Sequence, residues 1–160
     1  MKANWLRNCL LLVALFHFSL PLLAGPAMAA GDKLDVCSLV SAAELGKLYR
    51  KPLLPNSQSR GCYWSLKLNS MAYLHIGVHK HRRPLRKYFN ANLSSHIKLV
   101  EIKDLGEQGL MSVSEGSLGV VVIKKGDWVL QSAATFLEIK PGSEKHKVLW
   151  DIYRRVLSKL

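Results

Sequence analysis

Two pairs of strand-like segments constrain the fold of this chain more than any other feature. In the first pair, apolar side chains alternate with polar ones at residues 62–68 and again at 72–78, on either side of a short polar turn. Alternation of this kind is typical of strands that bury one face, so the two runs predict an antiparallel hairpin. The apolar runs 118–123 and 128–137, joined by Lys-Lys-Gly-Asp, predict a second and stronger hairpin.

Short helices are expected before and between these hairpins. Ser41 and Glu44 have the spacing of a capping box, in which the serine oxygen accepts a backbone N–H and the glutamate returns to the serine's own N–H. They predict a helix that continues to about Tyr49. The polar residues 55–59 are expected to form a loop. Pro84 suits the first position of a second helix, where its missing N–H is not needed.

A final helix completes the predicted fold. Ser143 can cap it, and its apolar residues form one stripe between Val148 and Leu157. The order of helix, hairpin, helix, hairpin and helix predicts an α+β fold. In this fold an antiparallel sheet is built from two hairpins, and three helices pack mainly on one side of it.

The N-terminal segment is typical of a cleavable secretion signal. A charged start precedes the apolar residues 9–23, and Ala-Met-Ala at 27–29 has the small residues of a cleavage site. We therefore predict a signal peptide at residues 1–29 and a single α+β domain at residues 30–160. A domain of that length can bury an ordinary core.

The alternative for this segment is a retained membrane anchor. The apolar run is interrupted by His17, Ser19 and Pro21, and it is shorter than the roughly 20 residues that a spanning helix needs. We therefore expect cleavage, and with it a secreted or periplasmic protein that has no transmembrane segment.

The two cysteines of the predicted mature chain, Cys37 and Cys62, are expected to form one disulfide. Secretion places them in an oxidising compartment, where an even pair most simply forms a bridge. A redox pair or a metal site is the alternative. Both require closer or more numerous ligands, such as Cys-x-x-Cys with further Cys or His.

The cysteines also lie in short motifs. Residues 35–45 are Asp-Val-Cys-Ser-Leu-Val-Ser-Ala-Ala-Glu-Leu, and residues 61–64 are Gly-Cys-Tyr-Trp. This pattern resembles a widespread class of secreted bacterial domains of unknown function, often lipoproteins, in which Cys-x-Leu-Leu-Thr-x-x-Glu precedes a second cysteine beside an aromatic. Residues 104–109 and 122–127 are similar to further segments of that class. The resemblance implies an extracytoplasmic domain and supplies no catalytic residues.

Basic residues outnumber acidic ones, and they are densest in one segment. Removal of the signal takes two of the 23 Lys and Arg residues and none of the 11 acids, so the formal charge falls from +12 to +10. Such an excess favours an anionic envelope component, an anionic membrane surface or an acidic protein as partner, and nucleic acid less so. Within residues 79–87, the candidate anion-binding residues are Lys80, Arg82, Arg83, Arg86 and Lys87.

Two interpretations of these basic residues remain open. Arginine donates paired hydrogen bonds to phosphate, and Tyr88 and Phe89 directly after can offer ring faces to a ligand. In the other interpretation the segment is a solvated connection whose rings point into the core. Peripheral contact with an anionic membrane is also possible through the basic face of the last helix, which carries Trp150 and Tyr153.

No pattern of catalytic or metal-binding residues stands out. His75 and His79 lie four positions apart in a predicted strand, about 13 Å, which is too far for one metal ion. Gly-x-Ser-x-Gly and His-Glu-x-x-His do not occur. We therefore predict a binding module without cofactor or metal rather than an enzyme. The alternatives are a small hydrolase or transferase whose site is assembled from distant residues, and a structural subunit of an envelope complex.

Overall fold

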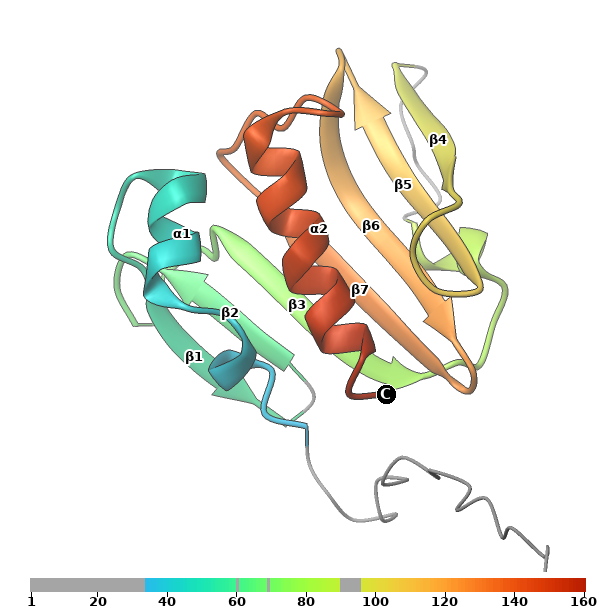
Figure 1. Cartoon of the computed structure of the whole chain (residues 1–160), viewed down its shortest axis with the longest axis horizontal. Coiled ribbons are helices and arrows are strands. Elements are labelled where there is room, and N and C mark those ends of the chain that lie inside the picture. The colour runs from blue at the N-terminus through green and yellow to red at the C-terminus, as the bar shows by residue number, and fades with distance from the viewer. Residues whose placement is uncertain (1–33, 60, 69, 90–95) are drawn as a thin grey trace, which may run out of the picture. The chain divides into compact units, whose positions relative to one another are not determined.

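A seven-stranded antiparallel sheet is the centre of the fold in the computed structural model, which describes residues 34–59, 61–68, 70–89 and 96–160 (Figure 1). The predicted signal peptide lies outside the described residues. The sheet order is β1-β2-β3-β7-β6-β5-β4. The strands are β1 (Leu54–Gln58), β2 (Gly61–Ser65), β3 (Leu74–Lys80), β4 (Ile97–Ile102), β5 (Gln108–Ser114), β6 (Ser117–Lys125) and β7 (Trp128–Ala134). The helices are α1 (Ala42–Tyr49), α2 (Glu144–Leu157) and two short 3-10 turns, η1 (Cys37–Leu39) and η2 (Leu85–Tyr88).

Both predicted strand pairs occur in this sheet, but the strands of the first are shorter than expected, because β2 ends at Ser65 and β3 begins at Leu74. β2 pairs with β3, with Trp64 opposite Leu74, and β6 pairs with β7, with Lys125 opposite Trp128. Only two residues join β6 to β7. The first of them, Gly126, has a φ of 54°, a left-handed conformation that glycine adopts without steric cost. The turn sequence therefore fixes the register of this hairpin.

The sheet is larger than two hairpins, because β1, β4 and β5 extend its two sides. The expected loop at 55–59 is wrong, since most of it belongs to β1, which pairs with β2 and places Leu54 opposite Ser65. The β1 side chains are mostly exposed, so no alternation of apolar residues marks this strand. An edge strand needs backbone hydrogen bonds on one side only, which is why Pro55 is tolerated there.

Helices α1 and α2 lie on one face of the sheet, as predicted for the first and last helices (Figure 1). The capping box is confirmed: Glu44 donates its backbone N–H to Ser41 Oγ at 3.2 Å and accepts the Ser41 N–H at 2.9 Å. Ser143 caps α2 by accepting the His146 N–H at 3.3 Å. Among the described residues, no helix has the length and apolar character needed to cross a membrane.

The predicted middle helix is wrong, because only the single turn η2 follows Pro84. No side chain caps it, and the backbone is already extended at Phe89. On a longer α-helix that begins at Pro84, Arg86 and Lys87 would lie in the first turn with no acidic residue beside them, where positive charge opposes the helix dipole. The prediction of three helices therefore reduces to two, α1 and α2, in the described residues.

The sheet carries a hydrophobic cluster on each face. Val121 and Ile123 of β6 belong to the main core, which the two α-helices cover, whereas Val122 belongs to a smaller cluster with η2. All three are 0% exposed. Because successive side chains of a strand point to opposite faces, burial of both faces explains the continuous apolar run in this strand.

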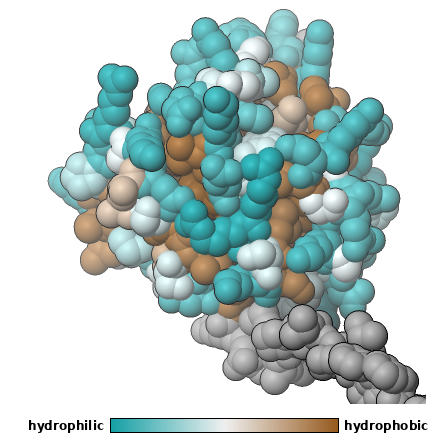
Figure 2. Space-filling view, in the orientation of Figure 1, coloured by the Kyte–Doolittle hydropathy of each residue, from teal (hydrophilic) through white to brown (hydrophobic). Residues whose placement is uncertain are grey.

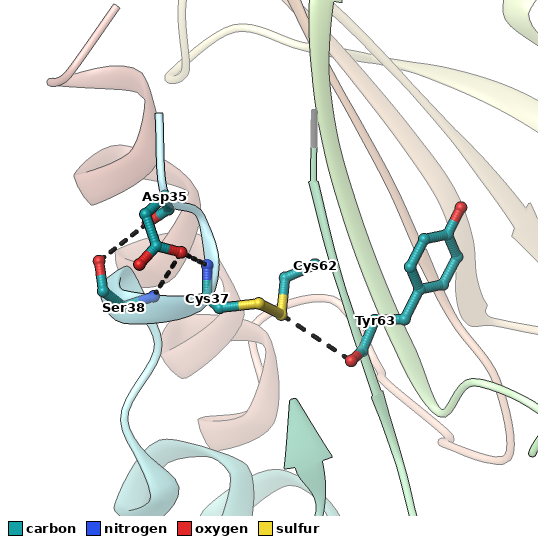
Figure 3. Close-up of a disulfide and its surroundings, with 5 residues drawn as sticks. All are labelled: Asp35, Cys37, Ser38, Cys62 and Tyr63. Atoms are coloured by element: carbon teal, nitrogen blue, oxygen red, sulfur yellow. Dashed lines mark hydrogen bonds between the residues drawn. A yellow bond between two sulfur atoms is a disulfide. The ribbon is translucent and has the colours of Figure 1, made fainter. Parts of the chain in front are cut away.

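The predicted disulfide between Cys37 and Cys62 is confirmed (Figure 3). It joins η1 to β2, with the two Cα atoms 5.1 Å apart. Asp35 holds the turn that presents Cys37, because its Oδ1 accepts the Cys37 N–H at 3.1 Å and its backbone O accepts the Ser38 hydroxyl at 2.9 Å. The bridge therefore fastens the chain before α1 to the sheet.

Candidate anion-binding surface

The five candidate cations follow one another around the end of β3. Lys80 lies over Trp128 on the face of the main core, and Arg83 lies over Tyr88 of the smaller cluster on the other face. Lys80 is the last residue of β3, and the others follow in the connection to η2 and in η2 itself. We call the set the basic segment: Lys80, Arg82, Arg83, Arg86 and Lys87. All five are exposed, and none forms an ion pair with another described residue. No described carboxylate therefore lies within ion-pair distance of these charges.

Apolar side chains from the same stretch of chain fix the basic segment to the sheet. Leu85, Tyr88 and Phe89 are 8%, 7% and 6% exposed, and they form one cluster with Val122 and Val129. The rings of Tyr88 and Phe89 therefore pack into the core. The faces of Tyr88 and Phe89 are thus not open for stacking on a ligand.

Two cations of the basic segment lie over aromatic rings. Lys80 Nζ is 5.0 Å from the ring centroid of Trp128, the residue opposite it on β7. The Arg83 guanidinium is 4.5 Å from the ring centroid of Tyr88. Contacts of this kind hold a long side chain in place while its charge stays in solvent, so both cations are positioned before any ligand binds.

A pocket of about 530 Å³ lies beside the basic segment. Arg86 and His81 line it together with the carboxylates Glu101 and Glu107. His81 donates its backbone N–H to the Asp127 carbonyl at 2.6 Å, and its buried Nδ1 has no hydrogen-bond partner among the described residues. Acids and a histidine in one pocket are the pattern that the enzyme alternative requires.

The Glu107 carboxylate, however, is already occupied by hydrogen bonds to the β6–β7 turn and its neighbouring strand. Its Oε1 accepts the Gly126 N–H at 2.8 Å, and its Oε2 accepts a hydrogen bond from Lys124 Nζ at 3.2 Å. The Gly126 amide, with a smaller contribution from Lys124, lowers the pKa of this carboxyl. A carboxyl with a lowered pKa is a poor general acid near neutral pH, so Glu107 does not supply one to this pocket.

The histidines of β3 contact aromatic rings. The His75 ring stacks on Tyr63, with centroids 4.1 Å apart, and the His79 ring lies 5.1 Å from Tyr88. Burial, followed by the nearby His79, lowers the pKa of His75. In the part of the chain that the structure describes, no group of three His, Cys, Asp or Glu residues is arranged to hold a metal ion.

Sequence reasoning missed a second pocket, of about 520 Å³, near the C-terminus of α1. Aromatic and cationic side chains dominate its lining, which includes Tyr49, Arg50, Lys51, Tyr73, Phe136 and Lys145. These residues come from separate segments of the chain, and the fold alone brings them together. No local motif could have marked them.

Comparison with protein-family models, with curated proteins and with solved structures finds no match to this chain. What the protein does is therefore inferred from its own residues and their geometry.

Proposed function

We propose that this protein is an extracytoplasmic, non-enzymatic binding module that holds a phosphate-bearing component of the cell envelope through the basic segment. The observation that carries this proposal is a division of roles within a single stretch of chain. The five cations are exposed, whereas the apolar residues between and beside them, Leu85, Tyr88 and Phe89, are buried. The buried residues hold the charges in place on the sheet.

Phosphate is the anion that this surface suits best. Three of the five cations are arginines, Arg82, Arg83 and Arg86. Guanidinium groups donate two parallel hydrogen bonds to phosphate, which gives directional recognition as well as attraction. The disulfide supports an oxidising location outside the cytoplasm. Signal cleavage and the resemblance to secreted bacterial domains stay predictions.

Binding of inorganic polyphosphate to the purified protein tests this proposal. The basic-segment variant carries Arg82→Gln, Arg83→Gln, Arg86→Gln and Lys87→Gln. We expect calorimetry at about 0.15 M salt, where the Debye length is about 8 Å, to show an affinity about ten-fold or more below that of the unchanged protein. The salt dependence should also become weaker, because fewer phosphate contacts release fewer counterions.

A matched control removes the same charge elsewhere on the surface. It carries Lys47→Gln, Lys98→Gln, Lys140→Gln and Lys159→Gln, all at exposed positions. We expect its affinity to stay within about two-fold, because exposed charges beyond the Debye length contribute little. Equal losses in the two variants would show that net charge, and not the basic segment, determines binding. That result, or no binding by the unchanged protein, would overturn the proposal.

A further inference from the structure

The large exposed apolar side chains gather at one end of the sheet. Six large apolar side chains are exposed in the described residues, and one of them, Val100, lies on the edge strand β4. We call the other five the apolar end: Leu54, Leu66, Leu68, Met71 and Phe136. Figure 2 shows brown atoms clustered at the molecular edge, on the side that carries β1 and β2 in Figure 1.

Strand register brings the apolar end together. Leu54 at the start of β1 is opposite Ser65 at the end of β2. Leu74 at the start of β3 is opposite Trp64 of β2 and Ala134, the last residue of β7. The loop between β2 and β3 carries three of the apolar residues, and the segment after β7 carries another. The basic segment follows the other end of β3, so the two surfaces are separate.

The exposure of Phe136 is built into the fold. Its φ is 57°, a left-handed conformation that is strained for a bulky residue, and its side chain is 67% exposed. Thr135 holds this conformation by donating its backbone N–H to the Tyr73 carbonyl at 2.8 Å and its hydroxyl to the Ala72 carbonyl. The Phe136 ring then lies 5.1 Å from the Tyr73 ring. Such strain is typical of a functional position.

Cations accompany the apolar end. Arg50, Lys51 and Lys145 line the second pocket together with Phe136, and no acidic residue lines it. None of the three forms an ion pair with a described residue. Lys67 lies in the loop between β2 and β3, which also carries three of the apolar residues. The apolar end therefore combines protruding apolar side chains with uncompensated positive charge.

We propose that the apolar end docks the protein on the surface of an anionic lipid bilayer. Leu68, Met71 and Phe136 are 65–67% exposed and can enter the boundary between headgroups and acyl chains. Lysine and arginine stems can lie along the apolar layer while their charges reach the headgroups. Anionic headgroups attract such cations, so charge complementarity selects the bilayer as the occupant of this surface.

Co-sedimentation with lipid vesicles at physiological salt tests this proposal. The vesicles contain phosphatidylcholine alone, or phosphatidylcholine and phosphatidylglycerol at about 3:1. We expect binding to the anionic vesicles to be about ten-fold stronger than binding to the neutral ones. The double variant Leu68→Asn/Met71→Asn should bind anionic vesicles about ten-fold more weakly. Its thermal unfolding should be unchanged, because both side chains are exposed.

Two control variants distinguish the apolar end from the rest of the protein surface. Val100→Asn changes an exposed apolar residue outside the apolar end and should keep full vesicle binding. In the background of the basic-segment variant, Leu68→Asn/Met71→Asn should still weaken vesicle binding about ten-fold, because the basic segment follows the other end of β3. Failure here is thus distinguishable from failure of the proposed function. Three results would each overturn the proposal. The double variant could bind vesicles as well as the unchanged protein, the unchanged protein could fail to bind anionic vesicles, or vesicle binding could depend only on the basic segment.

Discussion

Arg155 of α2 forms a bidentate ion pair with Glu44 of α1, with Nη2 2.7 Å from Oε1 and Nη1 3.1 Å from Oε2. The same Nη1 donates to the backbone carbonyl of Leu39 in η1 at 2.6 Å. Glu44 also completes the capping box with Ser41. One pair of residues therefore connects the two helices to each other and to the turn that presents the disulfide.

This ion pair predicts a loss of stability in acid. The hydrogen bond from Arg155, with help from Ser41, lowers the pKa of Glu44 from 4.5 to about 2. Because the folded pKa lies below the unfolded one, the stabilisation is complete above about pH 4.5 and is lost as the pH falls toward 2. We expect Glu44→Gln to cost about 1–2 kcal/mol at pH 7, below the full linkage value because the Arg155 side chain is 41% exposed.

Urea unfolding at pH 7 and pH 3 measures this effect. The free energy of unfolding should fall more steeply with acid in the unchanged protein than in Glu44→Gln. Arg155→Gln should reproduce the change, and the double variant should cost less than the two single changes together. Additive single changes would show that the two residues do not stabilise the fold as a pair.

The disulfide is predicted to contribute strongly to stability. Cys37 and Cys62 are 25 positions apart, and a loop of that length contributes about 3.5 kcal/mol on the chain-entropy model. We expect the Cys37→Ala/Cys62→Ala variant to unfold at a correspondingly lower urea concentration than the oxidised protein. Reducing agent should destabilise the unchanged protein and leave the variant unaffected. A variant as stable as the oxidised protein would show that the closed loop contributes nothing.

Tyr88 is predicted to couple the core to anion binding. It is 7% exposed, and the Arg83 guanidinium lies over its ring. Tyr88→Ala should cost about 3 kcal/mol and should also weaken polyphosphate binding, because the basic segment loses its anchor. Tyr88→Phe keeps the ring and should preserve both properties. If Tyr88→Ala lowers stability but leaves polyphosphate affinity unchanged, anchoring does not position the cations.

His75 predicts a second pH dependence near neutrality. Burial lowers its pKa below the usual 6.5, so the unfolded chain binds more protons than the folded one once the pH falls below about 6.5. Stability should therefore decrease as the pH falls through this range. His75→Phe keeps a ring against Tyr63 but cannot titrate. Its free energy of unfolding should therefore fall less between about pH 7.5 and 5.5 than that of the unchanged protein. An identical loss in both proteins would assign the dependence to other groups, such as His146, whose pKa burial also lowers.

Local signals predicted the parts of the fold that local chemistry determines. The Ser41–Glu44 capping box, the turn at Gly126 and the pair of cysteines each act through neighbouring atoms or through one bond, and each is present as expected. β1 left no such signal, because its side chains are exposed and only its backbone pairs with β2. Pro84 favoured a longer helix, but its first turn would carry Arg86 and Lys87, whose positive charges oppose the helix dipole.

The two candidate surfaces also differ in whether the sequence alone could predict them. The basic segment could be predicted because its charges follow one another along the chain. The apolar end could not, since Leu54, Met71 and Phe136 come together only through the register of four strands. The lining of the second pocket also combines Tyr49 of α1 with Lys145 of α2, and these two helices are far apart in the sequence.

Residue-by-residue mapping of polyphosphate contact tests the proposed function most directly. Amide chemical shifts of the protein, recorded by NMR during titration with inorganic polyphosphate, report which residues the anion reaches. The largest changes should occur between Lys80 and Lys87 and at Trp128, with Phe136 at the apolar end unaffected. Largest changes on another face, with the basic segment unperturbed, would contradict the proposal that this segment is the anion-binding surface.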